Sequence, residues 1–331
     1  MGLVDSSIRI SVIIPTFNVE GVVNRCLESL LSQGLDNIEV LFIDDCSSDR
    51  TVSVIDSWIK ERNSKETLYK IIRHKENQGV ASARNTGLNN ARGRYVYFLD
   101  SDDYLAPNSL RLLYETAEME RLEVVGCEWM LSFKHREKMM RQPDVFDGHN
   151  MFCQMAQGNM RWNLWLFLVR RSLYENNNIR FLAQADMGED MMVMMKLSFF
   201  AKRVRICHIA LYHYVQTNAN SLTRKYENVI GQISENIKEL ESFILRNGRE
   251  DLQQYIYLLQ LTVKRPFLVS QQSNHYKLWR EWFPEANKYL NLCTCRTNIR
   301  LLQRMALWKH DWFLRAYYWL VFRVVYGILY K

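Results

Sequence analysis

Short apolar runs alternate with amphipathic stretches along the first hundred residues. A run that is apolar throughout indicates a strand buried on both faces of a parallel sheet, whereas apolar residues at every third or fourth position indicate a helix with one buried face. By these criteria we expect strands at about residues 10–15, 39–44, 68–73 and 95–99, and helices at about 19–32, 48–59 and 80–91. Strands and helices that alternate in this way predict an α/β fold.

Polar and acidic residues follow three of the four predicted strands, at the end where open α/β sheets bind ligands. They are Pro15, Thr16, Phe17 and Asn18 after the first strand, Asp44, Asp45, Ser47 and Asp49 after the second, and Asp100, Ser101, Asp102 and Asp103 after the fourth. No turn between a strand and a helix contains Gly-x-Gly-x-x-Gly or Gly-x-x-x-x-Gly-Lys, which disfavours dinucleotide-dependent oxidoreductases and P-loop enzymes. The chemistry is therefore expected at an acidic sheet edge.

Carboxylates gathered at one sheet edge repel one another unless a cation or a hydrogen-bonding ligand joins them. The segment Asp100-Ser101-Asp102 offers the hard oxygen ligands that Mg²⁺ or Mn²⁺ prefer, and it leaves coordination positions for phosphate oxygens. A cation held there would neutralise a departing diphosphate. The alternative is that these aspartates only cap helices and form turns. Their occurrence at successive strand ends favours a site.

Four linked segments resemble the inverting glycosyltransferases of family 2, which have the GT-A fold. They are Ile13–Asn18 (IIPTFN), Asp44–Asp49 (DDCSSD), Asn77–Gly87 (NQGVASARNTG) and Phe98–Asp103 (FLDSDD). The resemblance implies a Rossmann-like mixed sheet, a nucleoside diphosphate sugar as the donor, with UDP-sugars favoured, and Mn²⁺ or Mg²⁺ as the cofactor.

The resemblance also implies roles on the donor side. Pro15, Thr16, Phe17, Asn18 and Asp44 would hold the nucleobase and ribose, Asp45 and Ser47 would shape the loop, and Asn77, Gly79 and Ser101 would complete the donor site. Asp100 would face the ribose and the water shell of the metal, and Asp102 would ligate the metal directly. Arg84 is suited to sugar hydroxyls or phosphate, or alternatively to a salt bridge with an acidic strand end.

The acceptor half is expected to supply the base. A strand is predicted at about residues 124–129, and the Trp165 ring after it would stack on an acceptor sugar or pack in the core. Many members of the family carry Trp-x-Lys-Leu here, and this chain has Phe167 in place of the lysine. Gly188-Glu189-Asp190 opens an apolar helix and resembles the catalytic motif of the family, which implies Asp190 as the general base and Glu189 as the residue that orients it. The helix dipole alone would also stabilise the acidic pair.

Two more residues, later in the chain, complete the expected site. His213 lies between two tyrosines and would join the metal or the phosphates, or else pack as an ordinary strand residue. Arg224 lies in a segment that resembles the mobile loop of the family and would clamp the diphosphate.

The charge is concentrated at the C-terminal end. The chain has 43 Lys and Arg against 36 Asp and Glu, a net charge of +7, and residues 291–331 alone contribute +6. This distribution disfavours nucleic acid as a partner. On one continuous helix, Arg300, Arg304, Lys309, Arg315 and Arg323 would fall within about half of the helical wheel, among aromatic residues. We therefore predict a helix that lies on an anionic membrane surface, with a core helix as the alternative.

The 331 residues thus predict a GT-A transferase domain over 1–225, with a donor half at about 8–122 and an acceptor half at about 123–225. A helical region over 226–331 would end in the membrane-surface tail from about residue 300. Seven scattered cysteines and the lack of a signal peptide or spanning segment favour the cytoplasm, at the inner face of the cell membrane.

The expected activity is transfer of a hexosyl or N-acetylhexosaminyl group to a hydroxyl of a glycan or a lipid-linked acceptor. One alternative is a non-catalytic GT-A subunit of a glycan assembly complex. Another is a sugar nucleotidyltransferase, which is disfavoured because the first strand is not followed by a glycine-rich basic loop.

Overall fold

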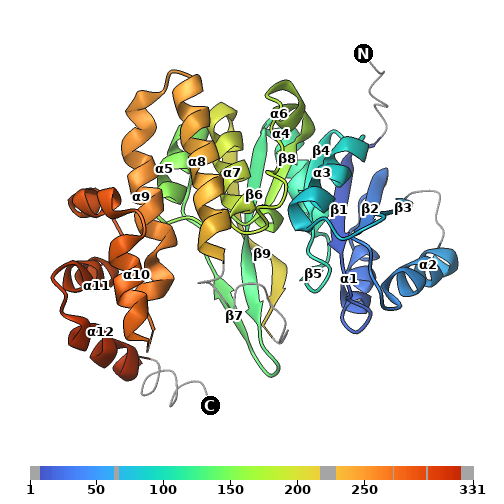
Figure 1. Ribbon diagram of the computed structural model, residues 1–331. Coiled ribbons are helices and arrows are strands. Elements are labelled where there is room, and N and C mark those ends of the chain that lie inside the picture. Colours follow the sequence, from blue (N-terminus) through green and yellow to red (C-terminus); the bar gives the residue numbers. More distant parts are fainter. Residues whose placement is uncertain (1–7, 63–66, 217–228, 271, 296, 322–331) are drawn as a thin grey trace. The chain divides into compact units, whose positions relative to one another are not determined.

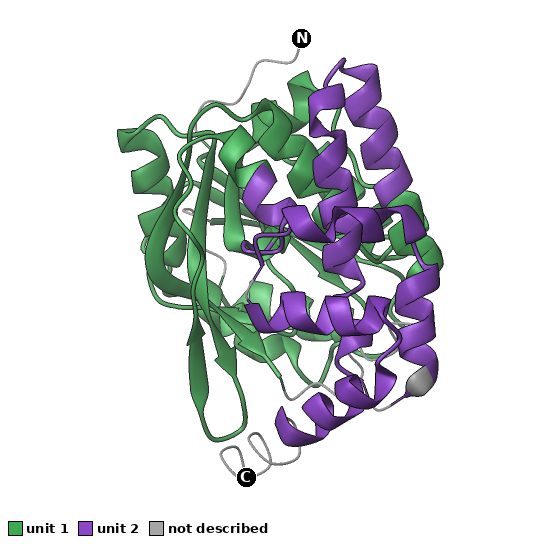
Figure 2. Ribbon diagram, turned by 90° about the vertical axis from the view of Figure 1, so that its left-hand side faces the viewer, with its two compact units in different colours: residues 1–152, 162–236 green, residues 153–161, 237–331 purple. Residues whose placement is uncertain are grey.

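The computed structural model describes residues 8–62, 67–216, 229–270, 272–295 and 297–321. The chain forms two compact units (Figure 2): unit 1 contains Met1–Phe152 and Trp162–Asn236, and unit 2 contains Cys153–Arg161 and Ile237–Lys331. The assignment of 1–225 as the transferase domain, and of a membrane-surface tail from about residue 300 within the region 226–331, stays a proposal.

The described residues of unit 1 form a nine-stranded mixed sheet with the order β3-β2-β1-β4-β8-β6-β9-β5, and β7 pairs with β6 (Figure 1). The strands are β1 (Ile10–Thr16), β2 (Ile38–Asp44), β3 (Thr67–Arg73), β4 (Tyr95–Phe98), β5 (Tyr104–Leu105), β6 (Val124–Ser132), β7 (Glu137–Met140), β8 (Phe167–Arg170) and β9 (Val204–Val215). The pairs β1–β2, β1–β4 and β2–β3 are parallel, so Thr16 and Asp44 end their strands side by side. This confirms the α/β fold.

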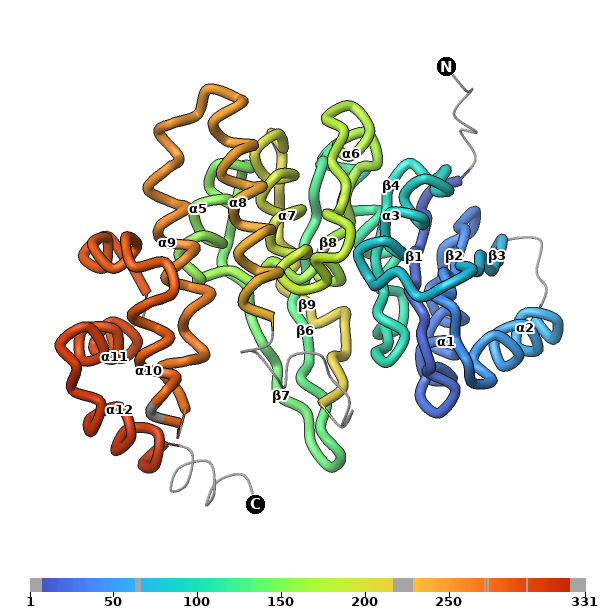
Figure 3. The backbone as a smooth tube through the Cα atoms, viewed as in Figure 1, coloured from blue at the N-terminus to red at the C-terminus, as the bar shows by residue number. Residues whose placement is uncertain are grey.

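Helices connect and cover these strands, as the path of the chain in Figure 3 shows. They are α1 (Val23–Leu30), α2 (Thr51–Glu61), α3 (Val80–Asn90), α4 (Ser109–Met119), α5 (Gly148–Ala156), the 3-10 turn η1 (Leu164–Leu166), α6 (Arg171–Asn176), α7 (Glu189–Phe200) and α8 (Ile230–Arg246). The first helix begins four residues later than residue 19, where it was predicted. The reason is that the backbone N–H groups of Asn18 and Glu20 donate to Ser47 Oγ at 3.0 Å and to Asp49 Oδ2 at 3.1 Å, which holds this segment in a turn.

Helix α7 is buried on nearly all sides. The side chains of Met191, Met192, Met194 and Met195 are completely inaccessible, so they belong to the core. Because α7 starts at Glu189, its packing fixes the position of the acidic pair that opens it.

Unit 2 is helical. After α8 it contains η3 (Glu250–Leu252), α9 (Gln253–Val263), η4 (Arg265–Leu268), α10 (Ser273–Glu281), η5 (Pro284–Leu292), α11 (Thr297–Leu307) and α12 (Asp311–Tyr318). Its core includes the fully buried rings of Trp279, Tyr276 and Phe267. None of the helices formed by the described residues is long and apolar enough to cross a membrane.

The prediction of one continuous helix through the C-terminal tail is wrong. Helix α11 ends at Leu307 and α12 begins at Asp311, and between them Lys309 adopts a left-handed conformation with φ of 60°. A residue in this conformation ends a right-handed helix. Arg300 and Arg315 therefore belong to different helices, and Arg323 lies outside the described residues.

Candidate active site

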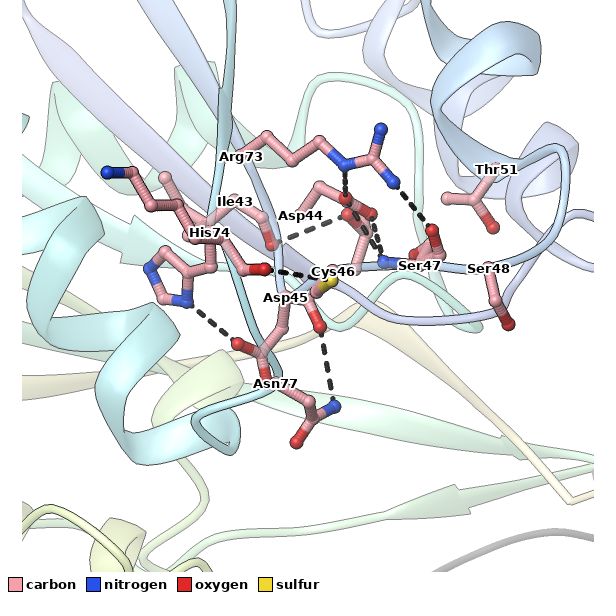
Figure 4. Close-up of polar contacts among 12 residues, drawn as sticks. Ile43, Asp44, Asp45, Cys46, Ser47, Ser48, Thr51, Arg73, His74 and Asn77 are labelled. Carbon is pink, nitrogen blue, oxygen red and sulfur yellow. Dashed lines mark hydrogen bonds and ion pairs between the residues drawn. The ribbon is translucent and has the colours of Figure 1, made fainter.

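A buried aspartate, Asp44, holds the loop after β2 in place through contacts with the loop backbone and with Arg73 (Figure 4). The Asp44 carboxylate is fully buried, accepts a hydrogen bond from the Ser47 backbone N–H at 3.2 Å, and forms an ion pair with Arg73 Nε at 3.1 Å. Arg73 also donates from Nη2 to the Ser47 carbonyl at 2.7 Å. No local sequence pattern points to Arg73, which ends the neighbouring strand β3 and reaches this loop because β2 and β3 are parallel and in register. The expected contact of Asp44 with a nucleobase stays a prediction.

The loop after β1 lies against this one. Pro15 is half-buried and Thr16 is buried at the end of the strand, whereas the Phe17 ring is 47% exposed. Asn18 has φ of 51°, and its Oδ1 accepts a hydrogen bond from the Ser48 N–H at 2.9 Å. The Phe17 ring is therefore open to a ligand at the predicted donor edge.

Asp45 ties the same loop to the start of α3. Its carboxylate accepts from the backbone N–H groups of Gln78 at 2.9 Å and Gly79 at 2.8 Å, and it also contacts His74 Nδ1 at 2.7 Å. Asn77 Nδ2 donates to the Asp45 carbonyl at 3.3 Å. These contacts satisfy backbone donors at the helix N-terminus and are those of a residue that shapes a loop.

Gly79 stands where the backbone needs a glycine. Its φ is 88°, and a Cβ at this position would collide with the carboxylate of Asp186. Asp186 accepts a hydrogen bond from the Ala81 N–H at 2.9 Å, so it caps the start of α3 from a segment about a hundred residues away. The sequence analysis did not identify Asp186.

Arg84 joins the donor and acceptor halves. Its guanidinium donates from Nη1 to Glu189 Oε1 at 2.5 Å and to Asp190 Oδ1 at 2.9 Å, and from Nη2 to Asp100 Oδ1 at 3.3 Å. The side chain is 5% exposed. Of the two predicted interactions for Arg84, the salt bridge with an acidic strand end is the one present. The two further bonds, to the start of α7, were not predicted.

Three carboxylates around one guanidinium leave this cluster with excess negative charge. Burial, with the nearby charges of Asp102 and Asp190, raises the pKa of Asp100 to about 6, although Arg84 opposes the shift. Burial and the charge of Asp190 raise the pKa of Glu189 well above its usual value. The same carboxylates raise the pKa of Arg84 despite its burial. The cluster is thus built to share a proton near neutral pH.

The acidic segment after β4 contains one structural and one half-buried aspartate. Asp103 is fully buried and accepts from Tyr212 Oη and the Val215 N–H, both at 2.7 Å. Asp102 is half-buried, and its charge acts on both Asp100 and Asp103. Ser101 between them is buried.

A metal ion fits this segment only if a bound substrate supplies further coordinating atoms. Within the described parts of the chain, no group of three His, Cys, Asp or Glu side chains is placed to hold an ion by itself. Mg²⁺ and similar ions are, however, commonly held by one or two carboxylates plus the phosphates of the substrate. Asp102 beside Asp100 matches that arrangement, with excess negative charge that a cation would offset.

The remaining predicted residues make other contacts in the structure or lie outside the described residues. His213 Nδ1 contacts Glu137 Oε1 at 2.8 Å, and its ring stacks on Tyr104. Trp165 is 3% exposed and stacks on Tyr212 with 4.2 Å between ring centroids, which favours its core alternative. Arg224 lies outside the described residues.

Two solved structures share this fold. TarS of S. aureus (residues 1–349), in complex with UDP-GlcNAc, matches with a TM-score of 0.67 and 20% identity over 94% of this chain and 90% of that one. The mannosyltransferase PcManGT of Pyrobaculum calidifontis, in complex with GDP-Man and Mn²⁺, matches with a TM-score of 0.51 and 18% identity over 92% of this chain and 87% of that one. At these identities the likeness shows the GT-A fold alone.

A relative in Bacillus subtilis (strain 168), described as the uncharacterized glycosyltransferase EpsJ, is 31% identical over 224 residues, which are 65% of this chain. The matched part covers 62% of the length of EpsJ. The sequence profile of Glycosyl transferase family 2 matches residues 11–194, a stretch that contains the β1 and β2 loops, the Arg84 cluster and the acidic segment after β4. This chain therefore belongs to glycosyl transferase family 2.

Proposed function

We propose that the chain is a metal-dependent, inverting glycosyltransferase that moves a sugar from a nucleoside diphosphate sugar to a hydroxyl of a glycan or a lipid-linked acceptor. The observation that carries this proposal is the Arg84 cluster. One guanidinium contacts Asp100, at the predicted donor side, and Asp190, the predicted base. The groups needed for departure of the nucleotide and for activation of the acceptor therefore face one small volume.

Asp190 is the proposed general base. As the acceptor oxygen forms its bond to the anomeric carbon, the bond from that carbon to the diphosphate breaks, and the acceptor proton moves to the Asp190 carboxylate. Arg84 donates to Asp190 Oδ1 and the Leu164 N–H donates to Asp190 Oδ2 at 3.4 Å, so both carboxylate oxygens are oriented. Glu189 accepts a hydrogen bond from the same Arg84 Nη1 that donates to Asp190, and it thereby helps to fix the guanidinium that orients the base.

The donor is proposed to lie across the loops after β1 and β2, with a UDP-sugar favoured. Binding of UDP-GlcNAc by TarS, which has the same fold, supports this choice. Asp102 is the proposed direct ligand of Mn²⁺ or Mg²⁺, a choice supported by the Mn²⁺ in the complex of PcManGT. When bound, the metal supplies positive charge that stabilises the departing diphosphate.

The test is Asp190→Asn, which keeps the shape of the side chain and removes the base. We expect transfer to fall by about 10²–10⁴-fold while donor affinity is retained. Released nucleotide, measured over a panel of UDP-, GDP- and dTDP-sugars with and without Mn²⁺, gives the readout, and Asp56→Asn on the surface of α2 is the matched control. Full activity of Asp190→Asn would exclude it as the base. Lack of turnover by the wild type with every donor would favour the non-catalytic subunit instead.

We further propose that unit 2 attaches the enzyme to the inner face of the cell membrane. Trp308, Trp312 and Trp319 are 58%, 70% and 59% exposed, and Arg304 and Arg315 are exposed on α11 and α12. Exposed aromatic rings with nearby cations are typical of a surface that binds anionic lipids.

Point substitutions test the membrane proposal better than truncation, because Leu302 and Leu314 on these helices are buried. We expect Trp308→Ser with Trp312→Ser to reduce sedimentation with phosphatidylglycerol vesicles by about tenfold or more. Unchanged sedimentation of this variant would count against the proposal.

A further inference from the structure

The hairpin formed by β6 and β7 carries cations that the proposed mechanism does not use. Residues 133–141 contain four Lys or Arg, one His and one Glu, a local charge of +3 within a part of the chain that is nearly neutral on average. Figure 1 shows the hairpin extending away from the rest of the sheet. Lys134, Lys138 and Arg141 are exposed, and none of them forms an ion pair with a described residue.

The carboxylate of this hairpin is directed inward and does not neutralise these cations. Glu137 accepts hydrogen bonds from Ser132 Oγ at 2.6 Å, from His213 Nδ1 at 2.8 Å and from Tyr104 Oη at 3.3 Å. These bonds, chiefly that of Ser132, hold the pKa of Glu137 below its usual value. Glu137 therefore fixes the turn end of the hairpin to β5 and β9, while Lys134, Lys138 and Arg141 stay exposed.

A cavity of about 350 Å³ lies at the turn of the hairpin, lined by Arg25, Ser132, Phe133, Lys134 and Val215. Arg25 comes from α1, and its guanidinium carbon lies 5.3 Å from the centre of the Tyr104 ring. Like Lys134, Arg25 forms no ion pair with a described residue. The cavity thus has a cation from each of two separate elements and no carboxylate among its lining residues.

This cavity borders the acidic segment of the candidate active site. Val215, in its wall, donates its backbone N–H to Asp103 Oδ1 at 2.7 Å. Cys26, the neighbour of Arg25 on α1, is buried, and besides this burial the charges of Asp103 and Asp102 raise the pKa of its thiol. An anion held between Arg25 and Lys134 would therefore lie next to the proposed site of the metal and the donor.

We propose that this cavity binds a phosphate group of the acceptor, and that the acceptor is therefore a chain that contains phosphodiester links. The inference rests on the proposed transferase function and adds a substrate class to it. A guanidinium and an ammonium group that line the same cavity suit the tetrahedral oxygens of a phosphate. The further cations of the hairpin, Lys138 and Arg141, would attract the following phosphates of such a chain. The diphosphate of the donor is assigned to the metal at Asp102, which leaves this cavity for the acceptor.

The experiment compares the double variant Arg25→Gln/Lys134→Gln with a matched double variant, Lys60→Gln/Lys202→Gln. The matched variant removes two exposed cations of unit 1 that do not line the cavity. The probe is a synthetic oligomer of glycerol phosphate, with an uncharged oligosaccharide of equal length as its control. We expect the first variant to lose affinity for the oligomer by about tenfold or more, most clearly at low salt. The matched variant should bind like the wild type. Affinity for UDP with Mn²⁺ should be unchanged in both variants, and thermal unfolding verifies that both are folded.

Other outcomes overturn the proposal. Equal binding of the oligomer by all variants, or no binding by the wild type, excludes a phosphate site. A parallel loss of UDP affinity assigns the cavity to the diphosphate of the donor. A loss of binding to phosphatidylglycerol vesicles, with oligomer binding intact, assigns the hairpin to lipid head groups. Because binding is measured without turnover, these results are distinct from a failure of the proposed function, which would appear as no nucleotide release from any donor.

Discussion

Each unit buries a basic side chain, and the two differ in what surrounds it. In unit 1, Arg84 contacts three carboxylates, which raise its pKa and keep it charged. In unit 2, Lys264 is fully buried and donates to Asn287 Oδ1 at 2.7 Å and to the Phe283 carbonyl at 3.3 Å, with its Nζ 4.5 Å from the centre of the Trp279 ring. Burial lowers the pKa of Lys264 to about 7.

The difference separates a functional charge from a structural one. A buried cation with several anionic neighbours stays ionised. The excess negative charge of those neighbours can then bind a metal ion, accept a hydrogen bond from a hydroxyl or take up a proton. A buried cation with only neutral partners loses its proton near neutral pH, and its main effect is on folding stability. Thus the buried cation beside the proposed chemistry and the buried cation that loses its own proton near neutral pH lie in different units.

The largest effect is expected from Arg84→Met. Removal of the guanidinium leaves three carboxylates without their shared cation, which should lower the free energy of unfolding by about 3–5 kcal/mol. Urea unfolding measures this loss. Arg94→Met is the control, because Arg94 pairs with Glu118 at the surface and should contribute less than about 1 kcal/mol.

Arg84→Lys distinguishes a role in catalysis from one in stability. The ammonium keeps the charge but cannot contact Glu189, Asp190 and Asp100 together, so we expect a protein that is folded but transfers sugar at least about tenfold more slowly. Arg84 opposes the rise in the pKa of Asp100, so a weaker interaction with the cation should raise that pKa further, and the acid limb of the kcat/KM profile should move to higher pH. A wild-type profile in Arg84→Lys would show that the cluster only stabilises the fold.

A smaller effect, specific to unit 2, is expected from Lys264→Met. Since the pKa of Lys264 is lower in the folded than in the unfolded state, the unfolded chain binds the extra proton between about pH 7 and 10.5, and stability must rise with pH across this window. The rise should be about 2 kcal/mol between pH 7 and 9 in the wild type and absent in Lys264→Met. Unfolding free energies at the two pH values measure it, with Lys277→Met at an exposed position as the control. Equal slopes in all three proteins would contradict the assignment.

The parts of the fold that the sequence predicts well are those with a continuous local pattern. Strands β1, β2 and β4 are buried on both faces and contain short apolar runs at residues 12–14, 40–43 and 95–98. Strand β5 has two residues, and β7, with one Glu, one Lys and two Met, is mostly exposed, so neither has a periodic pattern, and both were missed. Whether α11 and α12 are one helix depends on the conformation of Lys309, which no apolar spacing encodes.

The candidate site shows the same limit. The aspartates at the strand ends could be located because a parallel sheet brings such ends together. The contact between Arg84 and Asp190 joins residues 106 positions apart, and the cap that Asp186 places on α3 spans 105, so neither has a local signature. The position of Trp165 was left open between a sugar platform and the core because an aromatic residue satisfies both patterns, and only packing on Tyr212 distinguishes them.

The smallest expected effect comes from an exposed charge cluster in unit 1, at the bulge between β6 and β9. His208 contacts Glu128 through Nδ1 at 2.9 Å and Asp144 through Nε2 at 2.7 Å, and these bonds raise its pKa. Both partners are carboxylates, so both bonds form together only when the ring carries two protons. This stabilisation is present below about pH 6.5 and is lost as the pH rises through the higher pKa of the folded state. Because the His208 side chain is 47% exposed, solvent screening should limit the loss to about 0.5 kcal/mol. The free energy of unfolding should therefore decrease by this small amount between pH 6 and 8 in the wild type, and should not decrease in His208→Gln. A decrease as large as the rise expected from Lys264 would show that exposure of the titrating side chain does not account for the difference between His208 and Lys264.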